Sequence, residues 1–268
     1  MNRSFMKFCA LGLALAAALF VLAPASSAQD KDWKGFYIGG NVGGAFGSSD
    51  ATTTVSDPTP VYFGSASPAA IAIAGAQTFK PRGFSGGGQA GYNFQSGHLL
   101  IGAEFDFGGM SFNNSVSATG GYPCCSPYTF TVTQSMNTSW LVTMRPRFGY
   151  AGKKALIYGT AGLAMTNLNY QATFTDNYID GGSTIDATEN GGVKKTQTGF
   201  AAGAGAEFKM GSHVSFKAEY LYARFGTVST TSTNLVNPLF GGNYSAAVFT
   251  HTANLHSNVV RAGINYRF

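Results

Sequence analysis

Eight charged residues stand at alternate positions inside stretches that are otherwise apolar or small, and they form the largest set of side chains that could do chemistry. Four are acids and four are bases: Glu104, Asp106, Arg145, Arg147, Glu207, Lys217, Glu219 and Arg261. Carboxylates whose pKa is shifted in a cleft can act in catalysis or line an ion path. Buried charges are costly unless they are paired, and here the two signs are equal in number. We therefore predict a network of ion pairs that fills the interior of the fold and plugs it.

The histidines are the residues that could bind haem iron. His98 and His213 lie in short polar turns, whereas His251 and His256 lie near a long polar segment. A five-residue spacing is not a firm motif for an axial ligand pair. His251 and His256 are therefore weak haemin candidates, and solvated loop histidines are the favoured alternative. We predict neither a cofactor nor a metal site.

The possible nucleophiles have no complete catalytic set. A serine hydrolase needs a histidine beside a serine and a carboxylate behind it. His213 follows Ser212, but no acid lies nearby. The adjacent Cys124 and Cys125 in YPCCSPY offer too few ligands for a metal, and a local disulfide between them is left open. We predict that the chain is not an enzyme.

The spacing of these residues defines the elements that carry them. The stretch NVVRAGINYRF, from Asn258 to Phe268, alternates between an apolar and a more polar face, as a β-strand does. Similar alternation occurs at 33–47, 83–95, 99–112, 137–150, 155–166, 197–209 and 214–226. Short turns at 96–98, 151–154 and 210–213 alternate with long polar regions around 48–82, 113–136, 171–196 and 227–255.

This layout is typical of an outer-membrane barrel. We predict an all-β fold, an eight-stranded antiparallel transmembrane up-and-down β-barrel with long extracellular loops. The last strand would pair with the first, because no open strand edge is tolerated in hydrocarbon. Aromatic residues would form a periplasmic belt (Trp33, Phe94, Tyr150, Phe208, Tyr266, Phe268) and an outer belt (Phe46, Phe84, Phe107, Trp140, Tyr222). A soluble lipocalin-type carrier is the alternative, and the unequal connections and final Phe268 disfavour it.

The barrel places the eight charges in its lumen, which is just wide enough for side chains to fill. Glu104 and Asp106 can face Arg145 and Arg147 on the next strand. A second group can mesh across three successive strands: Glu207, Lys217, Glu219 and Arg261.

The first residues predict export. Arg3 and Lys7 precede an apolar run and the small residues before Gln29, as in a secretory signal peptide. We expect a leader at 1–28 and a barrel domain at 29–268. The 36 glycines, 14% aromatic residues and 11% charged residues are unusual for a soluble enzyme. Basic residues are scattered among acids, so no nucleic-acid partner is expected.

Several motifs resemble those of the alphaproteobacterial outer-membrane immunogenic proteins, small porin-family barrels related to the membrane domain of outer membrane protein A. They are DWKGFYIGGNVGGAFG, GGGQAGYNFQ, LIGAEFDF, YGTAGLA, AAGAGAEFKM with VSFKAEYLY, and VRAGINYRF. The resemblance covers essentially the whole chain after the leader. It implies an eight-stranded barrel without a catalytic motif, and Tyr266 and Phe268 as the signal for the barrel assembly machinery. Some relatives are linked to haemin binding, others to envelope integrity or host recognition.

The leading hypothesis for function is a structural, surface-interaction barrel in the outer membrane of a Gram-negative bacterium. Its partners would be the lipid bilayer, lipopolysaccharide, the assembly machinery, and host or cell-surface ligands bound through the loops. A narrow porin-like channel is the second hypothesis, and a haemin-binding surface protein is the third.

Overall fold

The computed structural model describes residues 33–58, 62–177, 187–239 and 241–268. The expected leader at 1–28 lies outside the described residues. Within those residues, no helix is long and apolar enough to cross a membrane.

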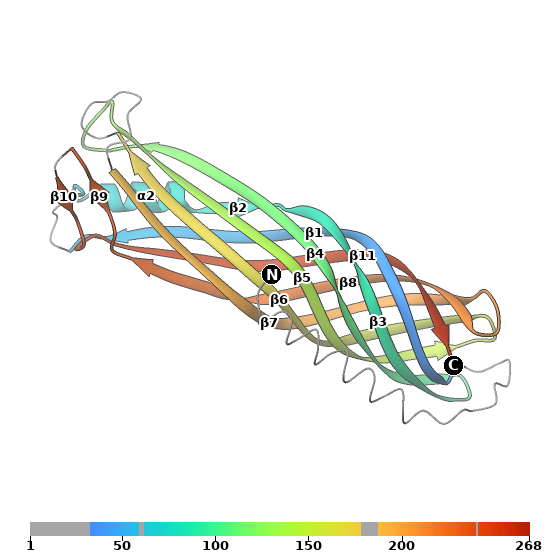
Figure 1. Cartoon of the computed structure of the whole chain (residues 1–268). Coiled ribbons are helices and arrows are strands. Elements are labelled where there is room, and N and C mark those ends of the chain that lie inside the picture. The colour runs from blue at the N-terminus through green and yellow to red at the C-terminus, as the bar shows by residue number, and fades with distance from the viewer. Residues whose placement is uncertain (1–32, 59–61, 178–186, 240) are drawn as a thin grey trace.

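Eight long antiparallel strands form a closed cylinder (Figure 1). They are β1 (Gly35–Ser56), β3 (Arg82–Ser96), β4 (Leu99–Gly121), β5 (Thr129–Ala151), β6 (Ala155–Asp176), β7 (Ala187–Lys209), β8 (Val214–Ser232) and β11 (Val248–Arg267). Each strand pairs with the next along the chain, and β11 pairs with β1 from Tyr37–Arg267 to Ser56–Val248. The prediction of an eight-stranded up-and-down barrel is confirmed.

The alternation of side chains also follows the prediction. On β4 the outward residues Leu99 and Ile101 are 58% and 46% exposed, whereas Leu100 and Glu104 between and beyond them are buried. The short turns at one end lie where they were expected, after β3, β5 and β7. In the half of the barrel that carries the short turns, the outward side chains are apolar, such as Ile38, Val42 and Phe46 on β1, with glycines between them. The outer surface of this membrane half is therefore apolar.

The strands are longer than predicted. β4 continues to Gly121 and β5 begins at Thr129, so most of the range 113–136 is strand rather than loop. The same correction applies to parts of 48–82, 171–196 and 227–255. In these extensions the polarity of the two faces is reversed: Phe130 and Val132 point inward and are buried, while Thr131 and Thr133 point outward. Outside the membrane the outer face of the wall meets water, which favours polar side chains there. A search for outward apolar residues therefore misses these parts of the strands.

A helix completes one side of the extended wall. β3 begins at Arg82, opposite Phe46 of β1, so it does not reach the extracellular part of the wall. β1 continues there for ten more residues, to Ser56. The space above β3 is occupied by α2 (Ser67–Gly75) and by β2 (Gln77–Phe79), which pairs with β1 (Figure 1). Gly75 is needed for this packing, because an added Cβ would lie 2.4 Å from the Thr53 carbonyl oxygen.

The wall is incomplete between β7 and β8. These strands pair from Lys209–Ser215 up to Gly199–Phe225, and no backbone pairing joins them above that point, although both strands are described there. We call the line between 188–198 and 226–232 the slit. Side chains bridge it: Ser232 donates to Glu189, and the Thr230 hydroxyl lies 3.5 Å from the Gly192 carbonyl oxygen. At its outer end, β9 (Val236–Asn237) pairs with β7 at Thr188, and β10 (Gly242–Asn243) pairs with β9.

Candidate functional site

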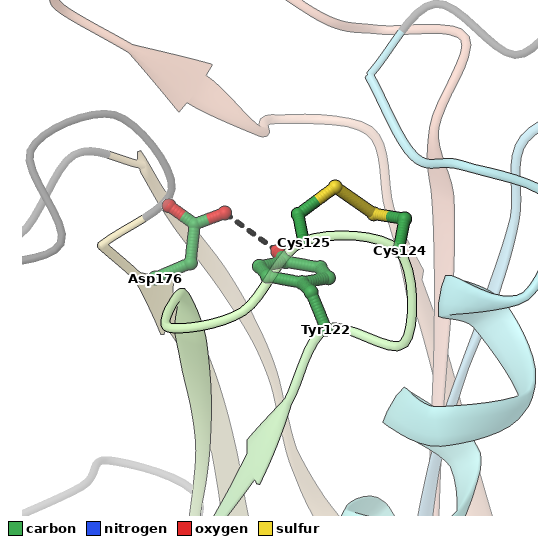
Figure 2. Close-up of a disulfide and its surroundings, with 4 residues drawn as sticks. All are labelled: Tyr122, Cys124, Cys125 and Asp176. Atoms are coloured by element: carbon green, nitrogen blue, oxygen red, sulfur yellow. Dashed lines mark hydrogen bonds between the residues drawn. A yellow bond between two sulfur atoms is a disulfide. The ribbon is translucent and has the colours of Figure 1, made fainter.

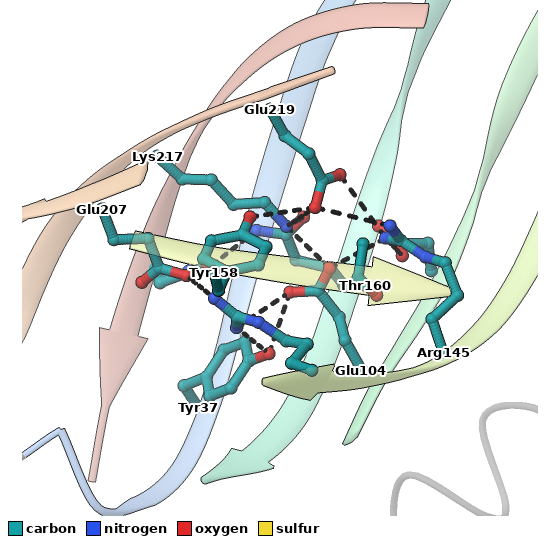
Figure 3. Close-up of polar contacts among 12 residues, drawn as sticks. Tyr37, Glu104, Arg145, Tyr158, Thr160, Glu207, Lys217 and Glu219 are labelled. Carbon is teal, nitrogen blue, oxygen red and sulfur yellow. Dashed lines mark hydrogen bonds and ion pairs between the residues drawn. The ribbon is translucent and has the colours of Figure 1, made fainter. Parts of the chain in front are cut away.

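The eight charged residues predicted to enter the lumen form one buried network. None of them is more than 6% exposed, and ion pairs connect all eight. Figure 3 labels Glu104, Arg145, Glu207, Lys217 and Glu219 among them. Their strands, β4, β5, β7, β8 and β11, surround the lumen at the same level. Every second side chain of a strand points inside. The inward charges on one strand are therefore two positions apart, as in Glu104 and Asp106 on β4.

Glu104 is the centre of the network. It lies directly opposite Arg145 in the β4–β5 register, and Arg145 Nη2 is 2.9 Å from its carboxylate. Arg147 Nη1 is 3.2 Å and Lys217 Nζ is 2.7 Å from the same carboxylate. Lys217 reaches it from β8, across the barrel, so this single acid joins separate parts of the wall (Figure 3).

Two further acids bind the remaining base, Arg261. Asp106 lies 2.5 Å from Arg145 and 2.7 Å from Arg261. Glu219 pairs with Arg261 and lies 3.4 Å from both Arg145 and Lys217. Of the pairings expected between β4 and β5, Arg145 therefore contacts both Glu104 and Asp106, and Arg147 contacts Glu104.

The predicted second group is not separate from the first. Glu207 lies opposite Lys217 in the β7–β8 register, but its ion pair is with Arg147 of β5. Lys217 instead turns to Glu104 and Glu219. The two groups expected from sequence thus merge into one network, because the narrow lumen brings opposite walls within reach of long side chains.

Uncharged residues complete the network, and sequence reasoning did not include them in it. The hydroxyl of Tyr37 donates to Glu104 at 2.8 Å, and that of Tyr158 donates to Glu219 at 2.9 Å. The guanidinium of Arg147 stacks on the Tyr158 ring at 3.8 Å. Gln89 accepts a hydrogen bond from Lys217 at 3.2 Å. The sequence could have indicated both tyrosines, because Tyr37 and Tyr158 are aromatic residues on the polar, inward face of their strands.

Little space remains inside this layer. A cavity of about 10 Å³ lies beside Asp106 and Arg261, which is room for one water molecule.

Trp33 closes the periplasmic end of the lumen. Its indole Nε1 donates to the Gly152 carbonyl oxygen at 2.9 Å, and it packs in a buried cluster with Leu100 and Leu156. Lys209 Nζ lies 5.1 Å from its ring, and the Arg267 guanidinium lies 5.5 Å from it. The prediction that Trp33 belongs to the outward aromatic belt is wrong: it is 1% exposed. It precedes β1, so strand alternation does not determine its direction.

The outer half of the interior is mainly apolar, with one polar layer that was not predicted. His251 is fully buried, with Nδ1 2.9 Å from the Thr53 hydroxyl and Nε2 3.1 Å from Glu189. His256 points to the opposite face of β11, where Nδ1 lies 2.8 Å from the Tyr222 hydroxyl. The two weak haemin candidates are therefore not brought together, and they cannot bind one iron from both sides.

The described loop residues at the extracellular end pack against one another. Asp176 accepts a hydrogen bond from Tyr122 at 2.6 Å (Figure 2). It accepts another from Tyr62 at 2.9 Å, so two loops are joined to β6. Cys124 and Cys125 are bonded to each other in the β4–β5 loop, so the open question about them is settled in favour of a disulfide (Figure 2). Beneath them, Phe63, Ile71, Phe174 and Phe249 belong to a buried apolar cluster.

Comparisons with known proteins agree with this architecture. Residues 13–268 match the model of the outer membrane protein β-barrel domain family. The chain is 30% identical over 249 residues to the 31 kDa outer-membrane immunogenic protein of Brucella melitensis, covering 92% of this chain and 88% of that protein. It is 26% identical over 193 residues to the 22 kDa outer membrane protein of Rhizobium leguminosarum, covering 72% and 64% respectively. The crystal structure of OprG from Pseudomonas aeruginosa is similar with 9% identity, coverage of 89% and 99%, and a TM-score of 0.38.

Proposed function

Since the chain belongs to the family of outer membrane protein β-barrel domains, we propose that it acts as a closed surface barrel that makes contacts outside the cell and conducts no ions. The protein resides in the outer membrane, where its apolar outer surface contacts lipid. The lumen of the barrel is structural, and the loops and extracellular walls make the contacts.

The observation that carries the proposal is the connected ion-pair network around Glu104. An ion path through this level would require at least some of these pairs to separate. Removing one partner from a buried pair typically costs about 3–5 kcal/mol, because the other charge stays desolvated. A network of several such pairs favours a closed lumen over a transiently open one.

The layers on either side support the same proposal. Trp33 covers the periplasmic side of the network, and Lys209 and Arg267 lie against its ring. On the outer side lies an apolar cluster that includes Met110, Phe112 and Leu221. Hydrated ions avoid an apolar constriction because they would lose their water there.

In this function the chain catalyses no reaction and binds no haem. The two relatives named above are called outer membrane proteins, and neither name states a reaction. Both ring nitrogens of the buried His251 are already engaged by Thr53 and Glu189. For assembly, we include the barrel assembly machinery as a partner that recognises Tyr266 and Phe268, whose side chains are 46% and 45% exposed.

The test is conductance of the purified full-length barrel in planar bilayers at high and low salt. We expect no discrete steps for the wild type. Lys217→Gln, inside the network, should behave in the same way if the barrel stays folded, and Lys194→Gln on the outer wall is the matched control.

Steady conductance whose ion selectivity changes with Lys217→Gln but not with Lys194→Gln would overturn the closed barrel. It would establish the narrow channel instead, because the buried charges would then line a hydrated path.

A further inference from the structure

The outward residues of β4 to β7 above the membrane form an in-register array of hydroxyl and amide side chains. Across the four strands, the rows from the outer end inward are Thr119, Thr131, Thr175 and Thr188; then Ser117, Thr133, Thr173 and Asn190; then Ser115, Ser135, Gln171 and Gly192; and finally Asn113, Asn137, Asn169 and Lys194. We call this surface the hydroxyl–amide wall. Gly192 and Lys194 are its only members without a hydroxyl or an amide side chain.

The wall is an outer face and not part of the core. Its side chains are exposed or half-buried, while the alternate residues Phe130, Val132 and Phe174 are buried on the inner face. Hydrogen bonds across strands hold several side chains in the plane of the sheet: Ser117 to Thr133 at 2.9 Å, Thr119 to Thr131 at 2.8 Å and Thr173 to Asn190 at 3.0 Å. Each hydroxyl still has capacity for a further hydrogen bond from a ligand.

The height of the wall determines what can touch it. Its lowest row begins three residues above Trp140, one of the outer-belt aromatics. At about 3.3 Å per residue the wall then rises by roughly 20 Å along β5. In the outer leaflet of this membrane, the layer directly above the hydrocarbon contains the sugars of lipopolysaccharide.

The charge pattern fits that layer. The wall has no acid, and its single cation, Lys194, lies in the lowest row, closest to the lipid phosphates. Arg224 on the neighbouring β8 is also exposed and lies opposite Phe200, on the membrane side of Lys194 along β7. The higher rows are neutral and offer donors and acceptors of the kind that sugar hydroxyls can match.

From this position and chemistry, we propose that the hydroxyl–amide wall binds the saccharide chains of the lipopolysaccharide molecules around the barrel. The inference depends on the outer-membrane location and deepens the surface-contact part of the proposed function. It does not depend on whether the lumen conducts, so the bilayer recordings and the experiments below can fail independently.

The first experiment measures access to the wall in outer membranes. Gln171→Cys lies in the wall, and Ile73→Cys lies on α2, where Ile73 is 79% exposed. The two sites are at a similar height, since Gln134 Nε2 donates to the Gly75 carbonyl oxygen and Ser135 lies opposite Gln171. A polyethylene glycol maleimide is the probe, and the wild type, with Cys124 and Cys125 bonded, is the blank.

We expect labelling of Gln171→Cys to be at least severalfold slower than labelling of Ile73→Cys in membranes with complete lipopolysaccharide. The difference should disappear in membranes whose lipopolysaccharide lacks its saccharide chain. Equal protection of both sites would mean general crowding and would overturn the proposal.

The second experiment measures binding directly. The ligand is the polysaccharide released from the producing bacterium's lipopolysaccharide, and the protein is the full-length barrel in detergent. Thr133→Val with Thr173→Val removes two wall hydroxyls but keeps β-branched side chains, and should weaken binding about tenfold. Thr52→Val with Thr252→Val removes the 2.6 Å hydroxyl pair between β1 and β11, outside the wall, and should leave binding unchanged. No binding by the wild type, or equal losses in both variants, would reject the wall as the site.

Discussion

At the residue scale, Glu104 shows how a membrane barrel can bury an acid. Its carboxylate contacts Arg145, Arg147 and Lys217, and the Tyr37 hydroxyl donates to it as well. The contacts come from β5, β8 and β1, so the acid is held by the closed shape of the barrel and not by its own strand alone.

The coupling within this network can be measured with a double-mutant cycle. Arg145→Ala should destabilise the barrel by up to about 3–5 kcal/mol, because it removes the cation that Glu104, Asp106 and Glu219 share and leaves an uncompensated negative charge in the interior. Glu104→Ala with Arg145→Ala should cost less than the sum of the single substitutions. The measurement is urea unfolding in detergent or lipid vesicles. Purely additive effects would mean that the charges are solvated and independent, and Lys194→Gln on the outer wall serves as a neutral control.

At the element scale, α2 takes the place of a strand above β3, and its packing depends on a close approach. An added Cβ at Gly75 would lie 2.4 Å from the Thr53 carbonyl oxygen, while one at Gly64 would lie 3.7 Å from its nearest neighbour. Gly75→Ala should displace α2 and speed proteolysis within 62–81, since overpacking typically costs about 1–3 kcal/mol. Gly64→Ala is the matched control. Equal cleavage rates for the two variants would show that α2 is not held by this contact.

The final strand gives a second prediction at this scale. The Phe268 amide donates to the Phe36 carbonyl oxygen at 3.0 Å, and its exposed ring lies 5.7 Å from Phe36. Deletion of Phe268 should reduce the folded protein in the outer membrane and leave unfolded chain in the periplasm. Phe94→Ala removes another lipid-facing aromatic without changing the chain end and should assemble normally. Normal surface levels of the deletion variant would reject Phe268 as an assembly signal.

The sequence predicted the faces of the strands better than their lengths. A period of two assigns Glu104 and Arg145 to the lumen wherever the strand lies, so the charge network was predictable from alternation and charge balance. The same period does not show where a strand leaves the lipid. Beyond that point Thr131 faces water and Val132 faces the core, so an outward-apolar pattern no longer identifies the strand. Trp33 and α2 lie outside any strand period, and their positions depend on tertiary packing.

At the scale of the whole molecule, the closed ring and its filled interior predict resistance to detergent. Every strand of the ring pairs with a neighbour on both sides in the membrane half. We expect the folded protein to migrate differently on a gel before and after boiling in dodecyl sulfate, because the unboiled barrel stays compact. Identical migration would contradict a closed barrel. The double variant Glu104→Ala with Arg145→Ala should lose the folded band at a lower temperature than the wild type.

The slit between β7 and β8 makes the two halves of the cylinder mechanically different. A tube that is slit along its length resists torsion far less than a closed tube with the same wall. The membrane half, closed by the β7–β8 pairs from Lys209–Ser215 to Gly199–Phe225, should therefore behave as a rigid base, while the extracellular half can twist about it. Amide hydrogens of 191–198 that point into the slit should exchange with deuterium faster than those of the facing β6 segment, which pairs on both sides. The Asn190 amide is left out of the comparison, because it donates to the Asn234 side chain. Exchange at equal rates along both segments would show that the side-chain bridges from Ser232 and Thr230 close the tube as firmly as backbone pairing does.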